Sequence, residues 1–128
     1  MKNKTITKGG QLVDVNGLAE PLHEFAEDRD WGQFHSPKNL VMALNGEVGE
    51  LNEIFQWLSE NLSRTVMENP VTALKVQEEL ADVLLYLMRL ASVLGVDLNE
   101  AARIKLLTNG QKYPVSKAHG SSKKYNEL

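Results

Sequence analysis

The chain has 128 residues, 42% of them hydrophobic and 24% charged, which is enough to fold around one core without covalent staples. It has no cysteine, which excludes disulfides and thiolate metal sites and suits a reducing compartment. The net charge of -3, from 14 basic and 17 acidic residues, argues against general nucleic-acid binding. No apolar run follows the basic start, so we expect neither a signal peptide nor a membrane span, and a cytoplasmic location.

The beginning of the chain is polar. Residues 1–16 contain a Gly-Gly pair and no sustained hydrophobic period, which predicts a flexible lead-in. A first helix is expected from about Gly17 to Asp28, with the apolar stripe Leu18, Leu22, Phe25 and Ala26. It is followed by "DRDWGQFHSP", a loop rich in aromatic residues and His.

Two longer helices are expected in the middle of the chain. Ser36-Pro37 is typical of a helix start and predicts a helix that continues to Leu58 or Leu62. After the polar connector "SENLSRTVMENP", apolar residues at the helical period predict a helix over Val71–Leu94, which the next glycine ends. Its apolar stripe comprises Val76, Leu80, Val83, Leu84, Leu87, Leu90, Ala91 and Leu94.

The last expected helix is short. Asp97 is a suitable cap for a helix from Leu98 to about Leu107, which an Asn-Gly pair stops. The polar, basic residues 113–128 are expected to be a loop or tail. Every ordered segment is then helical, so the predicted class is an all-α, four-helix bundle-type domain over residues 17–112.

Four acidic residues flank the apolar stripes of the two longer helices. Glu47 and Glu50, and likewise Glu79 and Asp82, are spaced i, i+3. Stripe residues lie within about 40° of the first acid of each pair, and the second acid lies about 60° to the other side, with Tyr86 between the second pair. If these helices pack antiparallel, the four carboxylates meet, and two like charges about 4 Å apart repel by roughly 4 kcal/mol. The acids are then protonated, point outward, or hold a cation, for which oxygen ligands favour Mg²⁺ or Mn²⁺.

The repetition of the acidic pair bears on these alternatives. One Glu-x-x-Glu pair is most often a solvated helix face, whereas two pairs at matched phase on successive helices favour a metal site. Gly46 and Gly49 flank Glu47 at a helical cost of about 1 kcal/mol each. Their missing side chains would let a ligand or another helix approach closely.

The acidic motifs resemble those of a known family. "EVGEL" and "EELADVLLYL" are similar to the ExxE...ExxD signature of the MazG-like, all-α nucleoside triphosphate pyrophosphohydrolases. "RDWGQFHSPKNL", "GEVGELNEIFQW", the "K...N...YP" stretch and "SSKKYNEL" resemble its dCTP pyrophosphatase branch, from about Leu22 to Leu128. The resemblance implies a homo-oligomer, a dimer or a homotetramer built from two dimers. It also implies Mg²⁺-dependent cleavage of dCTP, or a related or modified nucleotide, to monophosphate and pyrophosphate, as in nucleotide-pool cleaning.

The resemblance also implies which residues form the site. The metal ligands and catalytic residues would be Glu47, Glu50, Glu79 and Asp82, with Glu47 or Glu50 as a further candidate for the base. The substrate-binding residues would be Trp31, His35, Trp57, Tyr86, Lys105 and Asn109. The alternatives are core packing for Trp57, surface or interface packing for Trp31 and His35, and a solvated charge for Lys105. His23 falls one position out of register, because this chain has "LHEF" where the family branch has "LHAEF".

Other classes of protein compete with this interpretation. A di-iron bundle needs Glu-x-x-His on two helices, and neither "EVGE" nor "EELAD" supplies it. A non-catalytic helical oligomerisation or interaction module would carry the acids as surface charge and would hydrolyse no nucleotide. A helix-turn-helix protein would need a basic recognition helix. Apolar residues on more than one face of Val71–Leu94 predict contact with another copy of the chain.

Overall fold

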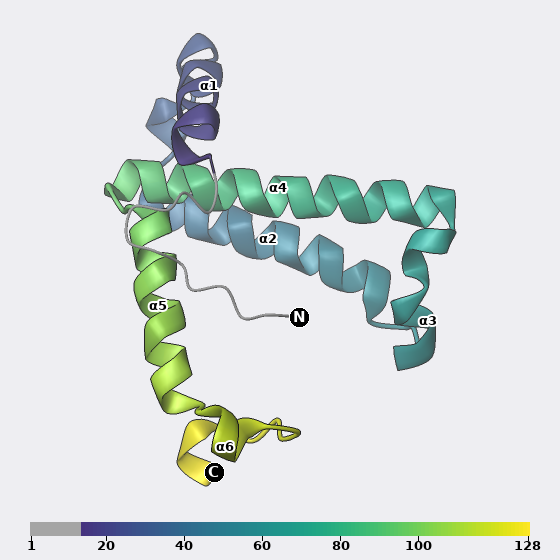
Figure 1. Ribbon diagram of the computed structural model, residues 1–128. Coiled ribbons are helices and arrows are strands. Elements are labelled where there is room, and N and C mark those ends of the chain that lie inside the picture. Colours follow the sequence, from purple (N-terminus) through teal and green to yellow (C-terminus); the bar gives the residue numbers. More distant parts are fainter. Residues whose placement is uncertain (1–13) are drawn as a thin grey trace. The chain divides into compact units, whose positions relative to one another are not determined.

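The computed structural model describes residues 14–128, without the side chain of Asn16, and is helical with no strand over that range (Figure 1). The all-α class is therefore confirmed. None of the helices in the described range is long and apolar enough to cross a membrane. Of the flexible lead-in predicted over residues 1–16, residues 1–13 lie outside the part of the chain that the structure describes. The elements are α1 (Val15–Asp28), η1 (Gly32–Phe34), α2 (Pro37–Phe55), α3 (Glu60–Arg64), η2 (Val66–Glu68), α4 (Pro70–Leu94), α5 (Leu98–Lys112), α6 (Val115–Ala118) and η3 (Tyr125–Glu127).

The described chain forms two compact units. The first is Val15–Val96, with α1 to α4, and residues 97–128 with α5, α6 and η3 belong to the second. The predicted boundaries, a domain over residues 17–112 and a tail over 113–128, stay a prediction.

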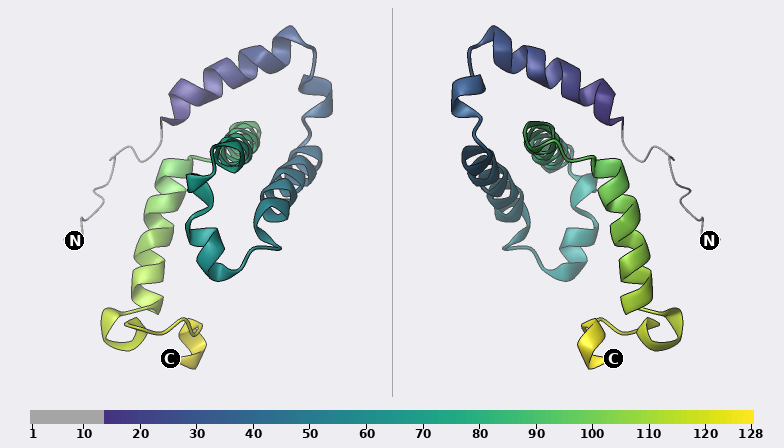
Figure 2. Two further views of the ribbon diagram at one scale, coloured as in Figure 1. Left: turned by 90° about the vertical axis from the view of Figure 1, so that its right-hand side faces the viewer. Right: turned by 90° about the vertical axis from the view of Figure 1, so that its left-hand side faces the viewer.

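Helices α2 and α4 form the centre of the first unit. They lie side by side and run in opposite directions, as the sequence predicted (Figure 1). Helix α1 packs against α4, and the side views show it crossing beside the pair (Figure 2). The buried apolar residues of the described chain are Ala26, Leu40, Ala73, Val76, Met88 and Ala91. They come from all three helices, so burial fixes α1 and α2 on α4.

The ends of the two long helices follow local signals in the sequence. The Ser36 hydroxyl accepts a hydrogen bond from the Asn39 backbone N–H, and Pro37 is the first residue of α2. The Asn69 side chain caps α4 in the same way. Gly95 ends α4 in the left-handed conformation, with φ of 69°, which costs glycine little. The predicted start of α2 and end of α4 are confirmed.

Helix α2 is shorter than predicted. It ends at Phe55, before Leu58 and Leu62. The reason is Ser59, whose side chain accepts from the Leu62 N–H and starts the separate helix α3. The predicted polar connector thus contains a short helix and a 3-10 turn, because a second serine cap restarts the chain in a new direction.

The apolar stripe predicted for α4 is split between core and surface. Val76 and Ala91 are buried, whereas Leu80, Leu84, Leu87 and Leu94 are exposed. The helical period alone does not show which of these residues face the core. The buried face of α4 instead includes Ala73, Met88 and Arg89, because both α1 and α2 pack on this helix. The predicted homo-oligomer stays a prediction.

The second unit is more helical than predicted. Helix α5 continues through the Asn-Gly pair to Lys112. It ends there because Tyr113 precedes a proline, which disfavours the helical conformation at Tyr113. The predicted cap at Asp97 is confirmed, since its side chain accepts from the Glu100 N–H. The last residues contain α6 and η3, and Tyr113 and Tyr125 meet edge to face with ring centroids 6.2 Å apart. The loop or tail expected over residues 113–128 thus contains two short helical segments.

Candidate active site

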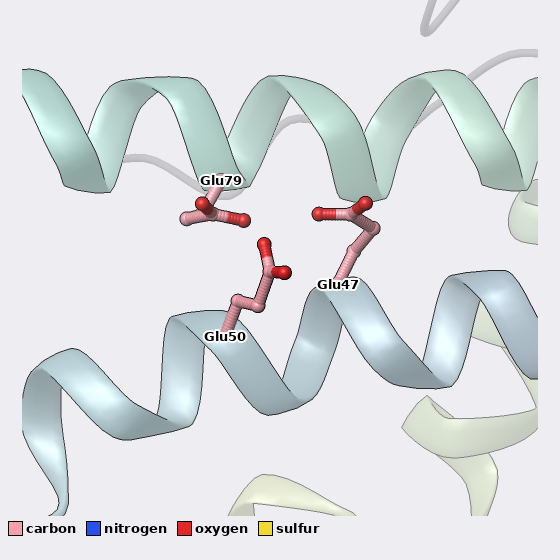
Figure 3. Close-up of side chains that lie close together, drawn as sticks. All are labelled: Glu47, Glu50 and Glu79. Carbon is pink, nitrogen blue, oxygen red and sulfur yellow. The ribbon is translucent and has the colours of Figure 1, made fainter.

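Three of the four predicted acids meet between α2 and α4. Carboxylate oxygens of Glu47, Glu50 and Glu79 lie within 4.8 Å of one another. Figure 3 shows Glu47 and Glu50 reaching from α2 toward Glu79 on α4. Two residues three positions apart share one face of a helix, so the antiparallel pairing brings both within reach of the opposite acid. We call these three residues the acidic cluster.

Two oxygens of the acidic cluster are buried without a partner. Glu47 Oε2 and Glu79 Oε2 are inaccessible to solvent and have no hydrogen-bond partner. Burial, together with the contacts and charges of Glu50 and Glu47, raises the pKa of Glu79 from 4.5 to about 7. Burial also raises the pKa of Glu47, and the charges of Glu50 and Asp82 act in the same direction. Without a counterion, the Glu79 carboxyl group therefore holds a proton up to about neutral pH.

A divalent cation fits this cluster. Buried carboxylate oxygens without partners are the hard donors that Mg²⁺ and Mn²⁺ prefer, and a cation would satisfy them and relieve their repulsion. The two histidines of this unit, His23 and His35, contact Arg89 instead of the acids. An all-oxygen donor set of this kind favours Mg²⁺ or Mn²⁺. A di-iron site would instead need a mixed set of Glu and His ligands.

The glycines beside Glu47 do not mark a close helix contact. A side-chain carbon added at Gly46 or Gly49 would meet no atom within 4 Å outside the local backbone. The expectation that another helix approaches there is wrong within the described chain, because α4 packs against a different side of α2. Their role toward a ligand stays a prediction.

Asp82 lies outside the acidic cluster and lines an adjoining pocket. It is one turn beyond Glu79 on α4, and its charge acts on Glu47. The pocket has a volume of about 220 Å³ and is lined by Leu22, Phe25, Trp31, His35, Asp82, Leu85, Tyr86 and Arg89. Three of the predicted substrate-binding residues, Trp31, His35 and Tyr86, thus share one pocket with a predicted metal ligand. Asp82 as a ligand stays a prediction.

The loop before α2 holds Trp31 in place. Asp30 has φ of 53°, a left-handed conformation that is uncommon outside glycine. This turn lets the Trp31 N–H donate to the Ala26 carbonyl at 2.9 Å. The Gln33 side-chain amide donates to the backbone carbonyl and to the carboxylate of Asp30. Trp31 packs edge to face on Phe25, with ring centroids 5.6 Å apart. The loop is therefore an ordered wall of the pocket.

The remaining predicted residues lie elsewhere. Trp57 follows α2 and is 88% exposed, so the core-packing alternative is wrong for this residue. It does not line the pocket of Trp31. Lys105 and Asn109 are on α5, one turn apart in the second unit. Substrate contact by these three residues stays a prediction.

Arg89 is a pocket residue that the sequence analysis did not identify. It is only 7% exposed, and its guanidinium contacts the rings of His35 and His23. A lone arginine within the apolar run "LLYLMRLASVL" was the available signal, since a buried charge requires partners. The helical period does not predict which residues these partners are.

Comparison with known sequences decides the family. The MazG-like family matches residues 42–128, a segment that includes the acidic cluster and Asp82. This chain belongs to the MazG-like family. The predicted resemblance and the MazG-like fold are confirmed.

The proteins to which this chain is similar include pyrophosphatases. The chain is 51% identical to dCTP pyrophosphatase 1 of Mus musculus over 108 residues, and 49% identical to that of Homo sapiens. Each alignment covers 84% of this chain and 64% of the relative, so the chain spans less than two thirds of their length. A crystal structure of a pyrophosphatase from Archaeoglobus fulgidus matches with a TM-score of 0.73 and 39% identity, covering 81% of this chain and 95% of that one.

Proposed function

We propose that this protein is a divalent-cation-dependent nucleoside triphosphate pyrophosphohydrolase, with dCTP or a related or modified deoxynucleotide as substrate. The observation that carries the proposal is the acidic cluster, with its two unpartnered buried oxygens, beside an aromatic pocket that Asp82 also lines. The names of the relatives, dCTP pyrophosphatase 1 and a pyrophosphatase, support the same activity.

Each part of the site has a role in this reaction. Glu47, Glu50 and Glu79 would hold the cation, with Asp82 as a further ligand at the pocket. When bound, Mg²⁺ or Mn²⁺ neutralises phosphate charge and polarises the α-phosphoryl group. Trp31 and Tyr86 offer aromatic faces to the base, and stacking of this kind contributes roughly 1 to 3 kcal/mol per base.

The bond changes define the products. A water oxygen attacks the α-phosphorus in line, the bond to the bridging oxygen breaks, and pyrophosphate leaves with that oxygen. A carboxylate of the cluster, Glu47 or Glu50, accepts the proton of the water and passes it to solvent. No side chain becomes covalently attached to the substrate in this scheme.

The test is a panel of canonical and modified NTPs and dNTPs, incubated with the full chain and Mg²⁺ or Mn²⁺ in ¹⁸O-labelled water. We expect monophosphate and pyrophosphate, with the label in the monophosphate. Diphosphate as the main product, or label in pyrophosphate, would contradict the proposal. A chain that hydrolyses none of the panel would instead be a non-catalytic helical interaction module.

Two expectations about the whole protein accompany this function. A nucleotide-pool enzyme needs neither nucleic acid nor a membrane as a partner, and the net charge of -3 agrees with the former. A cytoplasmic location and a homo-oligomeric state, as a dimer or a dimer of dimers, remain predictions.

A further inference from the structure

We propose that Arg89 is a positioning residue that fixes His35 and His23 as neutral rings with the proton on Nε2, so that His35 offers an N–H donor to the ligand in the pocket. The ligand contact rests on the proposed function, whereas the state of the two rings does not. The inference starts from the surroundings of the buried guanidinium.

Arg89 brings together three segments of the first unit. From α4, its Nε lies 3.1 Å from His35 Nδ1 in the loop before α2, and its Nη1 lies 3.2 Å from His23 Nδ1 on α1. The side chain is 7% exposed, and no carboxylate in residues 14–128 forms an ion pair with it. Within residues 14–128, the side chain of Arg89 therefore has the rings of His35 and His23 as its hydrogen-bond partners.

The chemistry of the guanidinium dictates the state of both rings. Arginine stays charged and can only donate hydrogen bonds. A ring nitrogen that faces it must accept, so Nδ1 of His23 and Nδ1 of His35 carry no proton. In a neutral ring the proton is then on Nε2. Burial and the charge of Arg89 lower the pKa of His35, which agrees with a neutral ring.

The fixed ring gives the pocket a defined polarity. His35 lines the pocket with Trp31 and Tyr86, and its ring meets Trp31 edge to face with centroids 6.3 Å apart. With Nδ1 occupied by Arg89, the nitrogen left for a ligand is Nε2, as a donor. It fits a ring that carries a carbonyl oxygen or an unprotonated ring nitrogen, as nucleobases do.

The rings can be observed directly by NMR of the full chain with ¹⁵N-labelled histidine. The chain has three histidines, and the exposed His119 in the second unit is an internal reference. At a mildly alkaline pH, where ordinary imidazoles are neutral, we expect His35 and His23 to show an unprotonated Nδ1 and a protonated Nε2. His119 should show an average of the two neutral tautomers, with the proton exchanging between Nδ1 and Nε2. A protonated Nδ1 on His35, or an average like that of His119, would overturn the proposal whatever the variants do.

Variants test the role of Arg89 itself. Arg89→Met keeps the length of the side chain without its donors and should move the His35 signals toward those of His119. It should raise the substrate KM by about ten- to a hundredfold, the range for an unmatched buried hydrogen bond, with little change in kcat. Arg89→Lys keeps the charge and should restore part of both effects. The control Arg64→Met, at an exposed arginine, should change neither.

A ligand titration keeps the test decisive if Arg89→Met fails to fold. Deoxycytidine monophosphate added to the wild-type chain should shift the His35 Nε2–H signal and leave His119 unchanged. Binding of this probe without a shift at His35 would overturn the ligand contact. Absence of hydrolysis with every nucleotide would overturn the proposed function, while the ring signals would still decide the role of Arg89.

Discussion

Glu47 on α2 and Glu79 on α4 face each other across the helix pair, each with one buried carboxylate oxygen that has no hydrogen-bond partner (Figure 3). Such an arrangement is stable only with protons or a cation between the two helices, because neighbouring negative charges repel. The state of this pair therefore links metal binding, pH and the packing of α2 on α4.

Mg²⁺ or Mn²⁺ should stabilise the protein. A ligand present at a hundred times its Kd adds about 2.7 kcal/mol to the free energy of unfolding, so Tm should rise with cation concentration and fall again with a chelator. Glu79→Gln should abolish most of the rise. Glu68→Gln, at an exposed acid of the same unit, should keep it. An equal rise in both variants would place the cation elsewhere.

The metal-free protein should lose stability as pH rises. The folded-state pKa of Glu79 is raised from 4.5 to about 7, so the folded chain retains a proton that the unfolded chain has lost between these values. The contribution is present in full below about pH 4.5 and is lost as pH approaches about 7. Glu79→Gln cannot titrate there, so its Tm should exceed that of the wild type increasingly as pH rises. A constant Tm difference in chelator, measured by calorimetry across this range, would argue against the raised pKa.

Removal of one acid should abolish hydrolysis without unfolding the chain. Glu50→Gln and Asp82→Asn replace a charged oxygen by a neutral amide of the same shape, and we expect a loss in kcat of about a hundredfold or more. Helical content by circular dichroism should be unchanged, and Glu50→Gln should even raise Tm without metal, because repulsion falls. Near-normal turnover in either variant would remove that residue from the site. Glu68→Gln again serves as the control.

Trp57→Ala should affect substrate binding and leave stability nearly unchanged. The side chain is 88% exposed, so its loss should change the free energy of unfolding by no more than about 0.5 kcal/mol. If Trp57 stacks on the base as the family resemblance implies, the substrate KM should rise by about ten- to a hundredfold. An unchanged KM together with an unchanged Tm would leave Trp57 outside the site. Trp31→Ala, in the pocket wall, provides the comparison.

The core on α4 should respond unequally to two neighbouring substitutions. Met88 is 2% exposed and Leu87 is 38% exposed. Met88→Ala should therefore cost about 2 to 5 kcal/mol of unfolding free energy, and Leu87→Ala clearly less, because only the first leaves a closed cavity. Urea unfolding of each variant measures the loss of unfolding free energy. It should be done on the monomer and, where one forms, on the oligomer. A larger loss for Leu87→Ala in the associated form would show that another copy covers that face.

Local signals in the sequence determined where α2 and α5 begin and where α4 ends. Ser36 and Asp97 cap the helices that follow them, and Gly95 ends α4, because each signal involves only residues within about one turn. The i, i+3 spacing likewise placed Glu47 and Glu50 on one side of their helix. Competition among local signals was harder to foresee, and the second cap at Ser59 ended α2 early.

The tertiary structure decided which of these groups meet. Helical period gives the faces of α2 and α4 but neither their rotation nor their offset, so only the packed pair shows Glu79 in the acidic cluster and Asp82 in the pocket wall. Arg89 meets His35 and His23, 54 and 66 positions away in the chain, through the packing of α1 and its loop on α4. No periodicity encodes such contacts. They follow from burying three apolar faces together, which leaves each buried polar group to be satisfied by whatever the packing brings beside it.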